Sequence, residues 1–357
     1  MYFNPEPKER RKDLYDFEEE LSDFVGFLKD FKIIVVKGLR RTGKTSLVKT
    51  GLNESGLPYI YFDTRFSENP RYVDFVNVIK AGLEGFVKKN RFAFSVSGIR
   101  ISLSPPSVEI RWRENKKRFS LYSLFSALDE VGEKRGVPII VAFDEAQELR
   151  KIKWIDFKRV FASVYDNLKH VRIVLTGSEV GLLDDFLDLE SVRSPLYGRL
   201  VAEISTKRLG GEQAFDFLRR GFTQHNIKVD MGELGEAVGF LDGIIGWLTY
   251  YGYARVKLGK APQEVFEMAT ELSLSELEKF LGNRRSNKHK TLLSALKKER
   301  GWAEAKRFVE EASGETIDDK NFTKLLHTLV DRGFVVKTNG KYVVSDPVVR
   351  RAIDRVK

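Results

Sequence analysis

Apolar and polar residues follow two alternating patterns over the first two hundred positions of the chain. Short apolar runs, which are typical of buried strands, occur at 32–37, 58–63, 137–143, 171–176 and 200–204. Segments whose apolar residues recur every three or four positions, as in amphipathic helices, occur at 9–30, 71–90, 119–135 and 154–169. Strands that alternate with helices form parallel sheets covered on both faces. The pattern therefore predicts an α/β domain.

Residues 92–113 break this alternation, because their apolar residues recur at every second position. Turns at Ser97-Gly98 and Pro105-Pro106 divide the segment. This pattern predicts an antiparallel hairpin or a three-strand meander that is inserted into the α/β domain.

From about residue 210 the pattern is helical. Helical segments at 288–298, 302–311 and 319–331 precede two alternating runs joined by Asn339-Gly340, a strong hairpin signal. Three helices followed by a hairpin is the order of a winged helix. With 357 residues the chain is long enough for two or three domains. We predict the α/β domain at 1–208 with its insertion at about 91–118, a helical domain at 209–283, and a winged helix at 284–357.

Composition narrows the kinds of site that the chain can hold. The sequence has no cysteine, which excludes disulfides and thiolate metal sites, and its four histidines show no metal-ligand spacing. The N-terminus is polar, and the longest apolar stretch, at about 244–254, is too short and too rich in glycine to span a bilayer. We therefore expect no membrane insertion and a cytoplasmic location.

The strongest chemical signal is the motif GLRRTGKT, which lies between the first apolar run and a helical segment. Its spacing is that of a phosphate-binding loop (P-loop), in which a Gly-rich turn and a helix N-terminus aim backbone N–H groups at an anion. Lys44 would reach the β- and γ-phosphates, and the Thr45 hydroxyl would ligate Mg²⁺. The predicted nucleotide-binding residues are Gly38, Leu39, Arg40, Arg41, Thr42, Gly43, Lys44, Thr45 and Ser46.

Hydrolysis also needs a carboxylate that holds the metal and a group that activates water. The third apolar run ends in Asp144-Glu145, the pattern of a Walker B motif. We predict that Asp144 holds Mg²⁺ through its water shell and that Glu145 is the general base. The structural alternative is a pair of solvated acids at a strand end.

Polar residues at the ends of other strands are further candidates. Thr176 ends the fourth apolar run and Ser178 follows it, where they would sense the γ-phosphate or the attacking water, unless they only cap the next helix. Arg199 precedes the last short strand and would stabilise charge that develops during phosphoryl transfer. We expect Arg199 to act within its own chain, with action on a second subunit as the alternative. A segment at 63–65, Asp-Thr-Arg, is either a nucleotide contact or a capped loop.

Four motifs in order, GLRRTGKTSL, AFDEAQEL, LTGS and PLYGR, resemble the archaeal ATPases of the STAND type. These are P-loop ATPases of signal transduction related to the AAA+ origin-recognition proteins. The resemblance covers nearly the whole chain and implies an AAA+-like parallel sheet, a helical lid, a C-terminal winged helix, and ATP or ADP as the nucleotide. Related proteins often carry Gly-x-Pro near the adenine, whereas the matching segment here, 243–247, reads GIIGW without proline.

The sequence has a net charge of +10, and its C-terminal part supplies most of it. Residues 284–357 hold 18 Lys and Arg against 10 Asp and Glu. In a DNA-binding winged helix the third helix and the wing contact DNA, and here they offer Lys320, Lys324, Lys337 and Lys341. The competing interpretation is a regulatory winged helix that packs on its own ATPase domain. The expected function is thus an ATP-binding and ATP-hydrolysing switch in which Mg²⁺-dependent nucleotide binding controls a surface for an unknown protein partner or a nucleic acid. The alternative is an ATP-regulated DNA-binding protein that acts through the basic winged helix.

Overall fold

Five of the apolar runs form one parallel sheet in the order β2-β6-β7-β1-β8, in a computed structural model that describes residues 1–90, 94–96, 99–104, 107–112, 120–282 and 287–356. The strands are β1 (Ile33–Lys37), β2 (Tyr59–Asp63), β6 (Ile139–Asp144), β7 (Val171–Gly177) and β8 (Val201–Ser205). Their parallel pairing, with Lys37 beside both Gly177 and Ser205, brings their carboxyl ends to one edge. The predicted α/β fold is therefore confirmed.

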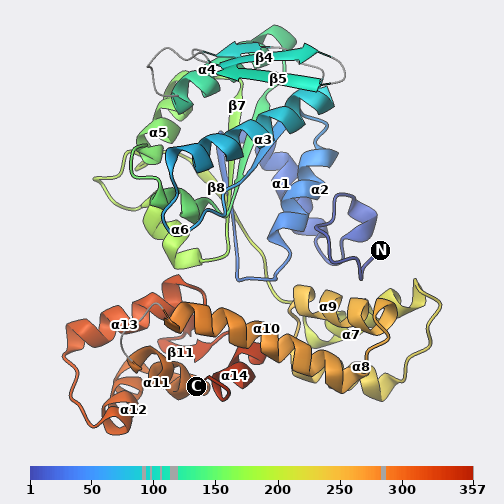
Figure 1. The fold of residues 1–357 in the computed structure, drawn as a ribbon, viewed down its shortest axis with the longest axis vertical. Helices are drawn as coiled ribbons and strands as arrows, with labels where there is room; N and C mark the ends of the chain where they lie inside the picture. Colours follow the sequence, from blue (N-terminus) through green and yellow to red (C-terminus); the bar gives the residue numbers. More distant parts are fainter. Residues whose placement is uncertain (91–93, 97–98, 105–106, 113–119, 283–286, 357) are drawn as a thin grey trace.

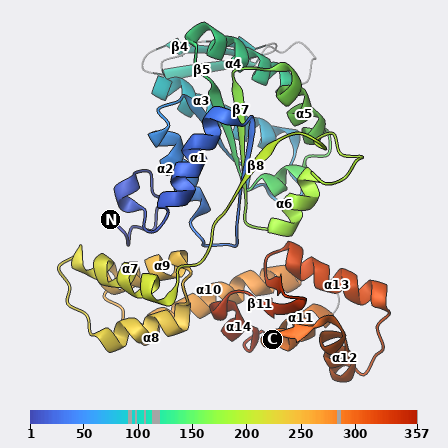
Figure 2. The same cartoon turned by 180° about the vertical axis from the view of Figure 1, so that it is seen from behind.

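Helices cover both faces of this sheet (Figures 1 and 2). One face packs against α1 (Glu18–Asp30) and α2 (Lys44–Glu54), and the other against α3 (Tyr72–Asn90), α4 (Leu121–Arg135), α5 (Phe157–Asn167) and α6 (Val180–Leu187). Successive residues of β1 enter opposite cores, with Ile34 and Val36 on the first face and Ile33 and Val35 on the second. The continuous apolar run of this strand follows from burial on both faces.

The first helix is shorter than the periodicity predicts. Residues 9–30 were expected to form one helix, but α1 begins at Glu18, and only a 3-10 turn at Arg11–Asp13 precedes it. Asp16 adopts a left-handed backbone (φ 58°), which interrupts the helix. Leu14 and Tyr15 therefore leave the helix and line the pocket described below.

The inserted segment forms the predicted three-strand meander. Strands β3 (Phe94–Val96), β4 (Ile99–Ser104) and β5 (Ser107–Trp112) pair antiparallel in sequence order. This small sheet lies at the end of the α/β part that is remote from the C-terminal helices (Figure 1). The side chains of the insertion lie outside the described residues.

The second half of the chain forms a separate layer beneath the carboxyl edge of the sheet (Figure 1). The helical part consists of α7 (Gly211–Thr223), α8 (Met231–Leu241), α9 (Ile245–Lys257) and α10 (Pro262–Gly282). The winged helix consists of α11 (Lys288–Ala295), β9 (Arg300–Gly301), α12 (Trp302–Ser313), α13 (Asp319–Asp331), β10 (Val335–Thr338), β11 (Lys341–Val344) and α14 (Pro347–Ile353). Asn339 and Gly340 have positive φ and form the predicted hairpin turn.

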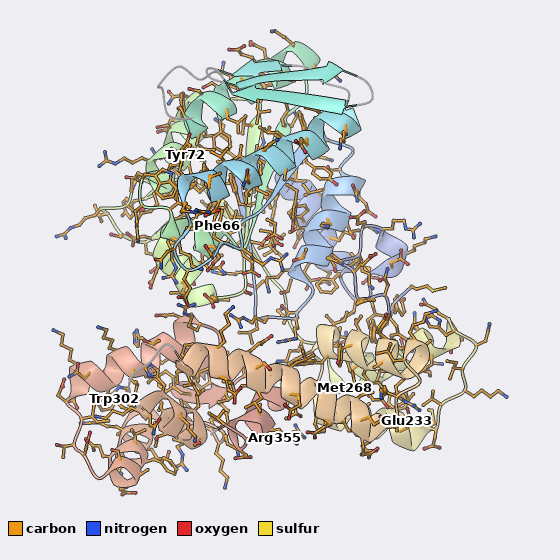
Figure 3. The ribbon with its side chains drawn as sticks, in the orientation of Figure 1. Phe66, Tyr72, Glu233, Met268, Trp302 and Arg355 are labelled. Atoms are coloured by element: carbon orange, nitrogen blue, oxygen red, sulfur yellow. The ribbon has the colours of Figure 1, made fainter. Side chains whose placement is uncertain are left out.

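Ion pairs and an apolar core join the two parts of this lower layer. Arg355, at the C-terminal end, lies against α10 (Figure 3) and pairs with Glu267 and Glu271 of that helix. The N-terminal segment also belongs to this layer, because Phe3 packs on Phe217 and Phe222 of α7. The chain therefore begins on the helical part and crosses to the sheet at α1. None of the helices in the described part of the chain combines the length and apolar content that crossing a membrane would require.

Candidate nucleotide site

A pocket of about 900 Å³ opens at the carboxyl edge of the sheet, between the two layers. This volume is within the usual range for small-molecule sites. Its walls come from the N-terminal segment, the P-loop, the turns after β2, β6 and β7, the lid helices α9 and α10, and the root of the wing after α13. The parallel register explains the position, because ligands of open α/β sheets bind where strands end.

The P-loop turns from β1 into α2 with two glycines that no other residue can replace without a clash. A Cβ at Gly38 would lie 2.2 Å from the Thr206 hydroxyl oxygen. Gly43 has a left-handed backbone (φ 89°), and a Cβ there would lie 2.8 Å from the Phe17 ring. The Leu39 carbonyl accepts hydrogen bonds from Thr42 Oγ1 at 2.7 Å and from Lys44 Nζ at 2.6 Å.

Lys44 is nearly buried, with 5% of its surface exposed. Burial lowers the pKa of its ammonium group to about 8, although the charges of Glu145 and Asp144 oppose this shift. A buried cation with a lowered pKa is a group whose charge an incoming anion would stabilise. Beside it, the Ser46 hydroxyl accepts the backbone N–H of Lys8 at 3.0 Å, so the N-terminal segment lies directly against the P-loop helix.

The two acids at the end of β6 face the P-loop helix and the end of β7. Asp144 is buried and accepts hydrogen bonds from Thr45 Oγ1, at 3.3 Å, and from Thr176 Oγ1. The Thr176 oxygen in turn accepts the backbone N–H of Glu145 at 3.1 Å. Thr64, after β2, donates to the carbonyls of Asp144 and Glu145 at 2.6 and 2.9 Å. Hydrogen bonds from two neighbouring strands thus fix the position of both acids.

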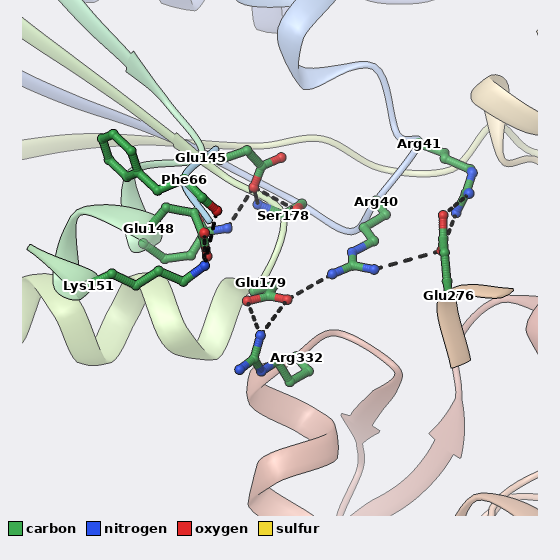
Figure 4. Close-up of polar contacts among 11 residues, drawn as sticks. Arg40, Arg41, Phe66, Glu145, Glu148, Lys151, Ser178, Glu179, Glu276 and Arg332 are labelled. Atoms are coloured by element: carbon green, nitrogen blue, oxygen red, sulfur yellow. Dashed lines mark hydrogen bonds and ion pairs between the residues drawn. The ribbon is translucent and has the colours of Figure 1, made fainter. Parts of the chain in front are cut away.

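Glu145 is held in a left-handed conformation (φ 56°), with its carboxylate toward Ser178 (Figure 4). Ser178 donates to it from Oγ at 2.7 Å and from the backbone N–H at 3.0 Å, and Gln147 Nε2 donates at 2.7 Å. Burial alone would raise the pKa of Glu145. The hydrogen bonds from Gln147 and Ser178, with the charge of Lys44, outweigh burial and lower the pKa. The carboxylate is therefore ionised at neutral pH, the state that can accept a proton.

The two P-loop arginines, which the sequence analysis places among the nucleotide-binding residues, pair with carboxylates beyond the loop. Arg40 donates to Glu179, directly after Ser178, at 2.8 Å (Figure 4). Arg41 pairs with Glu276 of α10, and its Nη1 donates to Glu276 Oε2 at 3.2 Å. The Cζ atom of the same guanidinium lies 4.0 Å from the Trp247 ring centroid. The P-loop is thus bound to both the sheet and the lid.

A third arginine reaches the pocket from the winged helix. Arg332, which follows α13, lies 3.3 Å from both carboxylate oxygens of Glu179 (Figure 4). The next residue, Gly333, has a left-handed backbone, and a Cβ there would lie 3.2 Å from the Ser178 carbonyl oxygen. The guanidinium of Arg40 packs over the Phe334 ring, with 5.7 Å between its Cζ atom and the ring centroid. The root of the wing is therefore docked on the P-loop and on the turn after β7.

Arg199, which was expected to act within its own chain, is not among the residues that line this pocket. It precedes β8, whose first residue, Val201, pairs with Ile33 at the amino end of β1. Four residues of strand, about 13 Å, separate Val201 from the edge that carries the P-loop. Arg199 instead pairs with Asp166 of α5 at 2.6 Å and also donates to the Pro195 carbonyl. The order of residues along the chain does not show at which edge of the sheet the loop before β8 lies, so the sequence could not reveal this position.

Of the remaining predicted positions, some lie at the pocket and others lie away from it. The lid segment 243–247 contacts the P-loop, because the Gly246 N–H donates to the Arg41 carbonyl at 2.9 Å. Arg65 lines the pocket and pairs with Asp63. By contrast, Lys320, Lys324, Lys337 and Lys341 are exposed on the winged helix.

The pocket residues that sequence reasoning missed include Glu179, Glu276 and Arg332. Glu179 had a local signal, because it directly follows the LTGS motif at a strand end. The others lie on elements far away in the chain, and no spacing rule connects them with the P-loop.

Comparison with known proteins gives concordant findings. The family described as "ATPase domain predominantly from Archaea" matches residues 14–250, and the "MCM protein C-terminal winged helix-turn-helix domain" matches residues 283–345. A Walker-type ATPase of Pyrococcus abyssi has a similar structure, with a TM-score of 0.82, 32% identity, and 99% of this chain and 100% of that chain covered. No curated protein matches the sequence.

The fold is also similar to that of the ORC2 protein of Aeropyrum pernix, solved as ADPNP and ADP complexes. The TM-score is 0.65, with 12% identity, and 99% of this chain and 96% of that chain are covered. At this identity the likeness shows the fold alone. It confirms the predicted AAA+-like arrangement of sheet, lid and winged helix.

The position of Arg199 leads to a direct prediction. We expect Arg199→Ala to leave nucleotide affinity and turnover of dilute protein within about twofold of wild type, because an exposed ion pair remote from the pocket contributes little. Calorimetry and a phosphate-release assay would measure both. A large loss of turnover that is relieved by mixing the Arg199→Ala and Lys44→Ala variants would instead place Arg199 at a neighbouring subunit's site.

Proposed function

The chain belongs to the family of ATPase domains that occur predominantly in Archaea, and from this premise we propose that it is an ATP-binding and ATP-hydrolysing switch of the STAND type. The observation that supports this proposal best is the composite pocket. Residues of the P-loop, the lid and the winged helix line one cavity. A nucleotide in that cavity would touch all three, so its presence and its number of phosphates would change their relative stability.

The polar groups of the pocket fit a nucleotide and a divalent cation. Lys44 would bind the phosphates, together with backbone N–H groups of the P-loop. The Thr45 hydroxyl and the Asp144 carboxylate, 3.3 Å apart, are hard oxygen donors of the kind that Mg²⁺ prefers. When bound there, Mg²⁺ would neutralise charge on the phosphate oxygens.

The chain's own residues would then activate water. Glu145 is ionised and can accept a proton once its carboxylate leaves Ser178 and Gln147. Thr176 would keep Asp144 and the Glu145 backbone in register during this movement. Nucleotide binding would thus prepare hydrolysis and alter the lid and the winged helix together, which presents a changed surface to a partner protein.

Binding through Lys44 should be linked to proton uptake. With its pKa near 8, most of this amine is neutral at pH 8.5, and bound phosphate raises the pKa because the opposite charge favours the ammonium form. Calorimetry in two buffers of different ionisation enthalpy should therefore detect proton uptake on ATP binding at pH 8.5 and less at pH 7.

The matched control is Lys44→Ala. This variant should bind ATP about tenfold to a hundredfold more weakly, because a charged hydrogen-bond donor is lost. It should also show no rise in proton uptake between pH 7 and pH 8.5. Equal affinity and equal uptake in the two proteins would contradict the assignment of Lys44 to the phosphates.

Glu145→Gln should separate binding from hydrolysis. We expect ATP affinity within about threefold of wild type but turnover at least ~100-fold slower, because positioned acid–base groups contribute about 10²–10⁴-fold. Glu148→Gln is the control, since this nearby carboxylate also lines the pocket but pairs with Lys151. A phosphate-release assay would distinguish the two. Unchanged turnover in Glu145→Gln would remove Glu145 from the role of base.

The second candidate function is ATP-regulated DNA binding, which the exposed lysines of α13 and the wing favour. Lys320 and Lys324 lie on the helix that reads DNA in winged helices. However, Asp318 and Asp319 lie at the amino end of this helix and weaken its attraction for phosphate. We therefore rank this function second.

A salt series tests the second function. If the winged helix binds duplex DNA, fluorescence anisotropy should show affinity that falls steeply with salt, and alanine at Lys320 and Lys324 together should reduce the logarithmic slope by about two. Lys29→Ala, an exposed change on α1, serves as the control. Affinity that is independent of salt, or a slope that the two alanines leave unchanged, would exclude this contact.

A further inference from the structure

One buried carboxylate in the pocket is shared by two arginines from different parts of the chain. Glu179 is 4% exposed and accepts from Arg40 of the P-loop and from Arg332 of the winged helix. A buried carboxylate requires paired charge, and Arg40 alone would provide it. Arg40 also lies 3.8 Å from Glu276, the partner of Arg41. With Arg332, three guanidiniums therefore face the two carboxylates Glu179 and Glu276, which leaves this cluster with a net positive charge at the rim of the pocket.

The cluster lies on the side of the pocket where the terminal phosphate would be. Glu179 directly follows Ser178, which holds the carboxylate of Glu145 at 2.7 Å. Glu145 is in turn close enough to Lys44 for their charges to interact. A terminal phosphate between Lys44 and Glu145 would therefore face the turn at 178–179 and the arginines bound there.

Arg332 has donors to offer such a phosphate. Within the described part of the chain, the side chain of Arg332 donates hydrogen bonds only from its terminal nitrogen Nη1. A guanidinium carries five N–H donors in a geometry that matches phosphate or carboxylate oxygens. The backbone position of Arg332 is set by the contact of Gly333 with Ser178. The side chain is therefore held at the pocket by an anchored backbone while part of its fork is available.

We propose that Arg332 is a cation that the winged helix supplies to the terminal phosphate of the bound nucleotide, with Glu179 as its partner when that phosphate is absent. The inference rests on the proposed nucleotide site and assigns to Arg332 the charge-stabilising role that the sequence suggested for Arg199. Since Arg332 belongs to the winged helix, docking of this domain and binding of a triphosphate stabilise each other. A nucleoside diphosphate lacks the terminal phosphate that Arg332 would contact, so its binding would not stabilise the docked winged helix through Arg332.

Calorimetry with a non-hydrolysable ATP analogue, ADPNP, and with ADP tests the proposal on the full chain. Arg332→Ala should weaken ADPNP binding by about tenfold or more, because charged hydrogen bonds are strong enough for such a change. ADP affinity should stay within about twofold of wild type. Arg307→Ala, an exposed arginine of α12 in the same winged helix, is the matched control and should leave both affinities unchanged.

Other outcomes overturn the proposal. An equal loss for ADPNP and ADP would mean that Arg332 only holds the domains together, and no loss for either would mean that it has no role at the nucleotide. If Arg332→Ala does not fold, Arg332→Gln and Arg332→Lys give the same comparison, with the lysine variant retaining part of the preference for ADPNP. If wild type binds neither nucleotide, the proposed site itself fails and the inference fails with it.

Discussion

The parallel register of β1, β7 and β6 is the constraint on which the site depends. Because these strands pair in register, Lys37, Gly177 and the end of β6 reach the same edge of the sheet. The P-loop lysine, the two acids and the polar turn after β7 therefore meet although they are far apart in the chain. Arg199 illustrates the same constraint from the opposite side, since its place before β8 puts it at the other edge.

The second organising feature is the pairing of buried charge at this edge. Glu179 and Glu276 neutralise the P-loop arginines, and through Arg332 and α10 they bind the P-loop to the lower layer. Separation of the two layers would break the pairs of Arg332 with Glu179 and of Arg41 with Glu276, and an ion that replaces a lost partner would offset this loss. A phosphate group is such an ion. The same ion pairs can therefore hold the two layers together and respond to nucleotide.

Sequence periodicity and motif spacing predicted much of the fold and the centre of the site. The apolar runs marked the inner strands β1, β6 and β7 because burial on both sheet faces leaves little room for polar residues, whereas the edge strands β2 and β8 alternate in burial. GLRRTGKT and Asp144-Glu145 were recognisable because their chemistry is local and follows directly from a strand. The start of α1 was predicted incorrectly, since apolar spacing alone did not reveal the left-handed turn at Asp16.

The sequence by itself determined the sheet, the P-loop, the two acids and the presence of a winged helix, because each depends on neighbouring residues and a short-range pattern. Only the tertiary structure decided which elements surround the pocket. The pairing of Glu179 with Arg332, the stacking of Arg41 on Trp247 and the remote position of Arg199 join segments separated by tens to hundreds of residues. Such contacts follow from how the two layers dock. Charge pairing and packing between the two surfaces set this docking, and the periodicity of apolar residues along the chain does not predict it.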